Sequence, residues 1–193
     1  MSNGMKIFLA IFALLVLIGI GIFMWGVGEY NKVIALDEQV KAQWAQVDNQ
    51  LKRRYDLIPN LVETVKGYAS HEKELFENIA NARTKYFQAQ TPEDKIQASS
   101  ALEGVLSRLL FLRETYPQLK ANESFLKLQD SLEGTENRIA VERKRYNEVA
   151  QVLNTYKRTV LGSFISSIAG VKEAGYYNVA ETEKAVPKVD FKK

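Results

Sequence analysis

An uninterrupted apolar stretch near the N-terminus limits what this chain can fold into. Residues 7–27 read IFLAIFALLVLIGIGIFMWGV, which is 21 residues without a charge and with no polar side-chain atom apart from the indole nitrogen of Trp25. As a helix this stretch would span about 31 Å, which matches the hydrocarbon core of a bilayer at roughly 30 Å. Trp25 and Tyr30 lie at its C-terminal edge, where amphipathic rings favour the headgroup region. The sequence therefore predicts a single transmembrane anchor within residues 1–28.

Two other interpretations of the stretch stay open. A cleaved signal peptide would use Lys6 as its charged start and residues 26–28 as a small-residue cleavage site, although its apolar region usually has only about 7–15 residues. A buried core helix would need a larger domain to enclose it. We expect a retained, single-pass anchor in the cell (inner) membrane. The positive-inside rule leaves the side of the soluble domain undecided, because Lys6 on one flank nearly balances Lys32 and Lys41 on the other.

Composition excludes several classes of function. The net charge is only +3, so we expect no nucleic-acid partner, which would require a clustered basic face. The chain has no cysteine, which excludes disulfides, thiolate metal sites and cysteine nucleophiles. A di-iron site in a helical bundle needs two Glu-x-x-His motifs, but His71 is the single histidine and Tyr68 stands three residues before it. We therefore expect no metal, no cofactor, no small-molecule substrate and no enzymatic activity.

Helical periodicity dominates the region after the anchor. Apolar residues recur at steps of three and four through residues 29–66, and Pro59 either kinks this helix or marks a restart. Gly67 and Ser70 then predict a stop and a new N-cap for a second helix over residues 71–90.

Two further helices are predicted from their start signals. Thr91, followed by Pro92 and two acidic residues, predicts a third helix that lasts to Tyr116. Asn122 is the expected cap of a fourth helix that reaches Val160. Its apolar seam alternates steps of three and four over five heptads, which is the period of a coiled coil or a helical bundle.

These elements predict an all-α fold. A single N-terminal transmembrane helix is followed by an elongated antiparallel four-helix bundle over residues 29–160 and by a short non-helical C-terminal tail. The amphipathic segment 161–175 either rests on the membrane surface or packs at the base of the bundle. The polar tail, residues 176–193, is expected to be extended or disordered. The candidate membrane contacts are Trp25, Tyr30, Phe164, Ile165 and Ile168.

Two polar bands are the candidate site. The first lies on the first helix and the second on the fourth, and together they comprise Arg53, Arg54, Asp56, Asn60, Glu136, Asn137, Arg143 and Asn147. Opposite charges that face each other across a bundle would set helix register and pairing. A ligand or partner contact is the alternative interpretation, with catalysis third.

Several strings of residues resemble the LemA family. They are WAQVDNQL at residues 44–51, RRYDLIPNLV at 53–62, TENRIA at 135–140 and PKVDF at 187–191, and the resemblance covers essentially the whole chain. It implies an N-terminally anchored α-helical bundle of no established catalytic activity. Relatives are described near membrane metalloproteases and in magnetosome membranes. Where relatives tend to have a Phe-Pro pair this chain has Val160 and Leu161, so we expect its last helix to continue further.

The expected function follows from the anchor and from the third helix, which is apolar nearly all round at residues 109–112. We expect a structural or adaptor protein that self-associates as a homo-oligomer on the lipid bilayer and organises membrane or membrane-protein partners. The alternative is an accessory or regulatory subunit of a membrane protease or signalling receptor. In that case the polar tail would add an extended segment to the edge of a partner's sheet.

Overall fold

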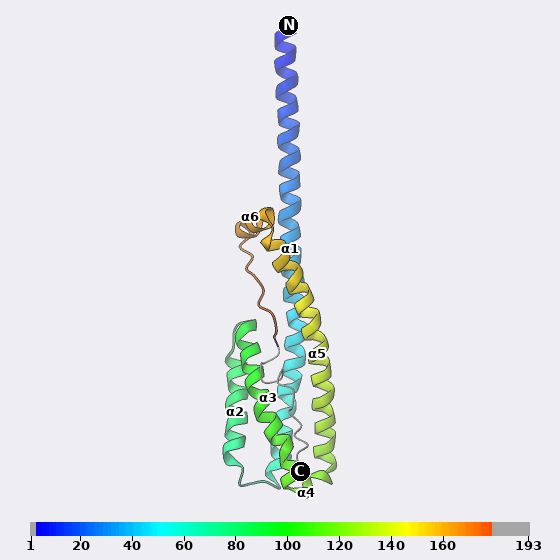
Figure 1. The fold of residues 1–193 in the computed structure, drawn as a ribbon, viewed down its shortest axis with the longest axis vertical. Coiled ribbons are helices and arrows are strands. Elements are labelled where there is room, and N and C mark those ends of the chain that lie inside the picture. Colours follow the sequence, from blue (N-terminus) through cyan, green and yellow to red (C-terminus); the bar gives the residue numbers. More distant parts are fainter. Residues whose placement is uncertain (1–2, 179–193) are drawn as a thin grey trace, which may run out of the picture. The chain divides into compact units, whose positions relative to one another are not determined.

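The computed structural model describes residues 3–178, and this part of the chain is all-α, with no strand. Six helices follow one another along the sequence (Figure 1): α1 (Asn3–Lys66), α2 (Lys73–Gln88), α3 (Pro92–Thr115), α4 (Pro117–Lys120), α5 (Glu123–Arg158) and α6 (Val160–Ala169). The predicted all-α class with a long apolar N-terminal helix is confirmed.

Two compact units divide these helices. Within the described residues, the first comprises 3–41 and 149–174, and the second comprises 42–148 and 175–178. Because α1 and α5 are long, each contributes residues to both units.

The second unit buries a seven-residue repeat on α5. Phe125, Leu132, Ile139 and Tyr146 are spaced seven apart and are all buried. This spacing keeps the four side chains on one face of the helix, where each removes its apolar surface from water. The corresponding residues of α1 begin with Val47 and continue at helical spacing to Val65.

Aromatic rings connect α1 to α2 and α5 within this unit. The rings of Tyr55 on α1 and Tyr86 on α2 stack with their centroids 4.0 Å apart, and Trp44 meets Tyr146 edge-on at 5.4 Å. Figure 1 shows α2 and α3 side by side. Side chains of α1, α2, α3 and α5 therefore share the core of the second unit.

The helix starts agree only in part with the sequence signals. Thr91 caps α3 by accepting a hydrogen bond from the Asp94 backbone N–H at 3.2 Å, and Asn122 caps α5 by accepting one from the Phe125 backbone N–H at 2.8 Å.

The prediction of Ser70 as the N-cap of the second helix was wrong. Residues 67–72 form turns instead, because the Glu72 N–H bonds to the Ala69 carbonyl, and α2 starts only at Lys73.

Two prolines behave differently in the helices. Pro59 lies inside α1 without ending it, so the restart alternative is wrong. Pro117 begins the short helix α4, whose Leu119 is fully buried. Because proline is favoured at the first helical position, Pro117 both interrupts the predicted third helix and starts a new one.

The first unit contains the apolar stretch of α1. In the described part of the chain, α1 is the one helix long and apolar enough to cross a membrane by length and composition, and its most apolar window has no buried residue. This exposure contradicts the core-helix alternative. A signal sequence near an N-terminus would meet the same criteria.

The expected continuation of the fourth helix beyond Val160 is wrong. α5 ends at Arg158, and the Thr159 hydroxyl accepts a hydrogen bond from the Gly162 N–H at 3.0 Å, which starts α6. Val160, which we expected on the apolar seam, is 89% exposed. A Cβ atom on Gly162 would lie 2.0 Å from the Tyr156 carbonyl oxygen, so this break requires glycine. α6 ends at Ala169 and is capped by Gly170, whose φ of 69° lies in the left-handed region.

Candidate functional site

Only one residue of the first polar band points into the second unit. Arg54 is 7% exposed, whereas Arg53, Asp56 and Asn60 all face solvent. Successive residues on a helix are rotated by about 100°, so of two adjacent arginines only one can face the core. The band therefore divides into one buried guanidinium and three exposed side chains.

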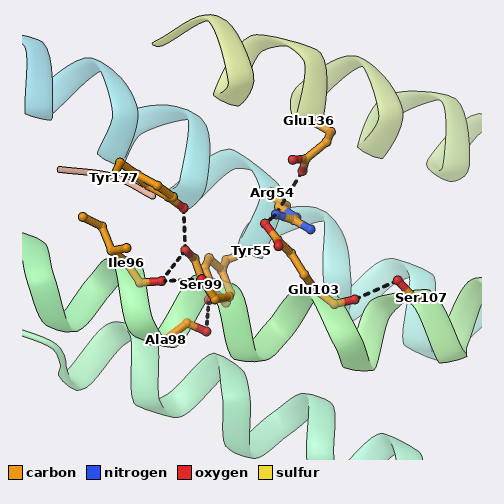
Figure 2. A network of polar contacts seen from close by, with 10 residues as sticks. Arg54, Tyr55, Ile96, Ala98, Ser99, Glu103, Ser107, Glu136 and Tyr177 are labelled. Carbon is orange, nitrogen blue, oxygen red and sulfur yellow. Dashed lines mark hydrogen bonds and ion pairs between the residues drawn. The ribbon is translucent and has the colours of Figure 1, made fainter. Parts of the chain in front are cut away.

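Arg54 joins three helices by charge. Its Nη1 lies 3.0 Å from Glu136 Oε2 on α5 and 3.4 Å from Glu103 Oε1 on α3 (Figure 2). The structure thus brings together Arg54 and Glu136, one residue from each predicted band. Glu103 was not predicted, because a single glutamate on a third helix carries no sequence signal of its partner.

The second band on α5 also divides. Asn137 is exposed, whereas Arg143 is 9% exposed and Asn147 is half-buried. The Arg143 guanidinium carbon lies 4.2 Å from the centroid of the Tyr177 ring, which is a cation–π contact. The Asn147 amide makes two hydrogen bonds to the backbone of Tyr177. Its Nδ2 donates to the Tyr177 carbonyl at 2.9 Å, and its Oδ1 accepts from the Tyr177 N–H at 2.8 Å.

Sequence reasoning also missed Tyr177. It lies in a segment expected to be extended or disordered, yet it is 3% exposed and its hydroxyl is 2.6 Å from the Ser99 hydroxyl on α3. Burial raises the pKa of its phenol. Figure 2 shows Tyr177 pointing at Ser99. A pair of aromatic residues, Tyr176 and Tyr177, in an otherwise polar tail was the available signal.

A second polar cluster lies between α1, α2 and α3. The Asp48 carboxylate accepts a hydrogen bond from the Tyr86 hydroxyl at 2.6 Å, and the Lys95 ammonium lies 2.7 Å from the same carboxylate. Burial, followed by the bond to Asp48, raises the pKa of Tyr86. Tyr55, stacked on Tyr86, donates to the Ala98 carbonyl at 3.4 Å, and burial raises its pKa too. Both phenols thus stay protonated as hydrogen-bond donors.

Most of these charged and hydroxyl groups are paired with one another. A cavity of about 280 Å³ lies beside Arg54, Glu103 and Glu136, and its remaining wall is largely leucine. Within residues 3–178, no three His, Cys, Asp or Glu side chains gather in a way that could hold a metal ion. The arrangement fixes the positions of α1, α3, α5 and the start of the C-terminal segment within this unit.

The predicted membrane contacts lie in the first unit. A groove of about 460 Å³ is bordered on α1 by residues that include Trp25 and Tyr30, and on α6 by Phe164, Ile165 and Ile168. Ile165 is buried, whereas the other four are exposed. The structure thus brings all five residues to one apolar surface.

Polar contacts hold the chain after α6 in the same unit. The Asn154 amide pairs with the backbone of Ala174, donating at 2.8 Å and accepting at 3.0 Å. The Tyr156 hydroxyl donates to the Glu29 carboxylate at 2.9 Å. Burial and this bond raise the pKa of Tyr156 to about 12. Asn154 thus pairs with the backbone after α6 in the same way as Asn147, which lies seven residues earlier on α5.

Comparison with known proteins places the chain among relatives of low identity. The LemA family profile matches residues 43–191. The protein LemA of Metamycoplasma hominis is 21% identical over 94% of this chain and 83% of its own length. Magnetosome protein MamQ 2 of Paramagnetospirillum magneticum is 22% identical and MamQ of Magnetospirillum gryphiswaldense is 23% identical, each over 77% of this chain.

The match spans 64% of the length of the two magnetosome proteins. The family profile extends from α1 through the polar bands into the C-terminal segment, which is well over half of the sequence. The chain belongs to the LemA family.

Proposed function

We propose that this chain is a membrane-anchored structural or adaptor protein that self-associates at the cell (inner) membrane and organises membrane or membrane-protein partners. One observation carries the proposal: the exposed apolar stretch and the first helical segment of the second unit are parts of one continuous helix, α1. The names of the magnetosome relatives agree with a role at a membrane.

The anchor accounts for the exposed surface of α1. Large apolar side chains are exposed at nearly every position from Ile7 to Val27. A soluble protein rarely exposes a continuous apolar surface of this size, whereas lipid tails would cover it without cost. A helix also satisfies its own backbone hydrogen bonds, which a membrane requires.

The second unit would serve as the organising domain. We propose that its parts of α1 and α5, together with α2 and α3, form an antiparallel four-helix bundle. The short connections between α1 and α2 (residues 67–72) and between α2 and α3 (residues 89–91) favour reversal of direction at each joint. The polar network supports a structural role, because Arg54 and Tyr177 are used to join helices to one another.

Self-association is supported by one exposed aromatic residue. Of the apolar run on α3, Leu109 and Leu112 are buried, but Phe111 is 67% exposed and borders a groove with Leu75 of α2. The exposed phenyl ring and the groove beside it offer an apolar surface that a second copy of the chain would cover.

The test uses the full chain in detergent micelles. Phe111→Ser should shift the mass measured by light scattering toward the monomer, whereas Val141→Ser, which also replaces an exposed apolar residue of the second unit, should leave it unchanged. A wild-type protein that is strictly monomeric would contradict self-association.

The accessory-subunit alternative depends on the C-terminal tail. Residues 179–193 lie outside the described part of the chain, whereas Tyr177 is built into the second unit. Deletion of residues 179–193 therefore separates a partner-binding role from a folding role. Loss of a co-purifying membrane protease or receptor with an unchanged helical content would favour this alternative.

A further inference from the structure

We propose that α6 lies along the bilayer interface and that the groove between α6 and α1 binds a phospholipid acyl chain. This inference rests on the proposed function, since it requires residues 7–27 to be in the membrane. It adds a lipid-binding site to the anchor, and the site is formed by segments more than 130 residues apart in the sequence.

The position along α1 at which α6 packs supports the placement of α6 at the bilayer interface. The groove is bordered on α1 by Ile22, Phe23 and Val27, which belong to the last turns of the apolar stretch. Tyr30, one turn further along, also lines the groove. Because these residues of α1 would lie at the hydrocarbon boundary, a helix packed beside them cannot lie away from the membrane. Figure 1 shows α6 against this part of α1.

Three faces of α6 differ in chemistry. Gly162, Ile165 and Ser166 are buried within the unit. Ser163 and Ser167 are exposed and polar. The third face carries Leu161, Phe164 and Ile168, which recur at helical spacing and are 54%, 67% and 62% exposed.

The third face of α6 indicates which kind of molecule fills the groove. An apolar stripe and a polar stripe on a short helix are typical of segments that lie in the membrane interface. The apolar stripe forms one wall of the groove, so a single apolar environment would cover both the stripe and the exposed α1 surface.

The groove suits a hydrocarbon chain better than a polar ligand. Its volume of about 460 Å³ lies in the range of small-molecule sites, and its lining is apolar apart from the polar ends of Trp25 and Tyr30. Arg158 and Lys172, both exposed, flank α6 in the sequence. Basic side chains next to an interfacial helix attract phosphate headgroups. A phospholipid therefore matches both the apolar groove and the basic residues that precede and follow α6 in the sequence.

The absence of cysteine from the chain permits a matched test in vesicles of phosphatidylcholine and phosphatidylglycerol. Full-length Phe164→Cys and Ser163→Cys variants are labelled with the same environment-sensitive fluorophore and reconstituted with lipids brominated on their acyl chains. We expect quenching at position 164 to be at least twofold stronger than at position 163. Equal quenching at the two positions would overturn the interfacial placement.

The native tryptophans distinguish failure of this inference from failure of the anchor. Trp25 and Trp44 are the two tryptophans of the chain, so Trp44→Phe leaves Trp25 as the reporter of the span. Quenching of Trp25 by brominated lipid, without quenching at position 164, would refute the lipid groove and leave the anchor standing. If neither is quenched, both proposals are wrong.

A photoreactive group identifies the occupant of the groove. Benzophenone-alanine in place of Ile168 should give an adduct of the chain with one phospholipid molecule by mass spectrometry. An adduct of two chains would mean that a second copy fills the groove. A cross-link to residues 179–193 would mean that the chain's own tail does. Either result, or no adduct, would overturn the lipid assignment.

Discussion

Replacement of the buried guanidinium tests the polar network of the second unit most sharply. Arg54→Met keeps most of the side-chain volume but removes the charge that joins α1 to α3 and α5. The Arg54 side chain is 8% exposed, and those of Glu103 and Glu136 are 18% and 43% exposed. Loss of one partner of a buried pair costs about 3–5 kcal/mol, and we expect about 3 kcal/mol because Glu136 reaches water.

The assay is urea unfolding of the full chain in detergent. In a Trp25→Phe background the fluorescence of Trp44, which contacts Tyr146, reports on the second unit. With a slope of roughly 2 kcal/mol per molar urea, a loss of about 3 kcal/mol lowers the midpoint by about 1.5 M. Arg53→Met is the matched control, because the neighbouring arginine is exposed and its replacement should cost less than about 0.5 kcal/mol. Equal midpoints for the two variants would refute the structural role of Arg54.

A double-mutant cycle assigns the effect to the ion pair. Glu136→Gln alone should cost about 1 kcal/mol or less, because its side chain is partly exposed and Arg54 keeps Glu103. In the Arg54→Met background the same change should cost clearly less. Strict additivity of the two changes would mean that the 3.0 Å contact does not contribute to stability.

Three further predictions concern other contacts. Asn147→Leu removes both hydrogen bonds to the C-terminal segment and should lower the free energy of unfolding by about 2 kcal/mol in urea; a wild-type midpoint would contradict this. Burial raises the pKa of Tyr146 to about 12 against about 10 in an unfolded chain, so its contribution is complete below pH 10 and is lost as the pH rises to 12. Urea midpoints should therefore fall between pH 10 and pH 12, less so in Tyr146→Phe, and a flat profile would be inconsistent with this burial. Gly162→Ala should displace α6 and increase acrylamide quenching of Trp25, whereas Gly134→Ala, where a Cβ atom meets no other atom within 4 Å, should not.

Local signals made much of the fold predictable. The apolar stretch, the cap at Thr91 and the seven-residue seam of α5 each depend on residues close together in sequence, where helix geometry alone decides the outcome. Ser70 failed as a cap because the turn at residues 67–72 satisfies its own backbone hydrogen bonds. The exact position of the break before α6 could not be predicted, because it depends on the close approach of Gly162 to a backbone carbonyl.

The candidate site was less predictable, because its contacts join distant residues. Sequence identified Arg53 and Arg54 as one block, but only the rotation of α1 decides which of them is buried. Glu103 and Ser99 gave no signal, since their partners lie 49 and 78 residues away. Tyr177 was assigned to a polar tail from composition, although it forms an aromatic pair with Tyr176 in that tail.

The central claim is that residues 7–27 cross a bilayer once and remain attached to the helical units. It is tested directly by a membrane-impermeant maleimide applied to sealed vesicles from cells that express single-cysteine variants at Asn3 and Ala121, both exposed and one on each side of the apolar stretch. We predict that only one of the two positions is labelled from outside and that the other becomes labelled when the vesicles are opened. Labelling of both from outside, or loss of the cysteine at position 3 from the mature chain, would contradict the account.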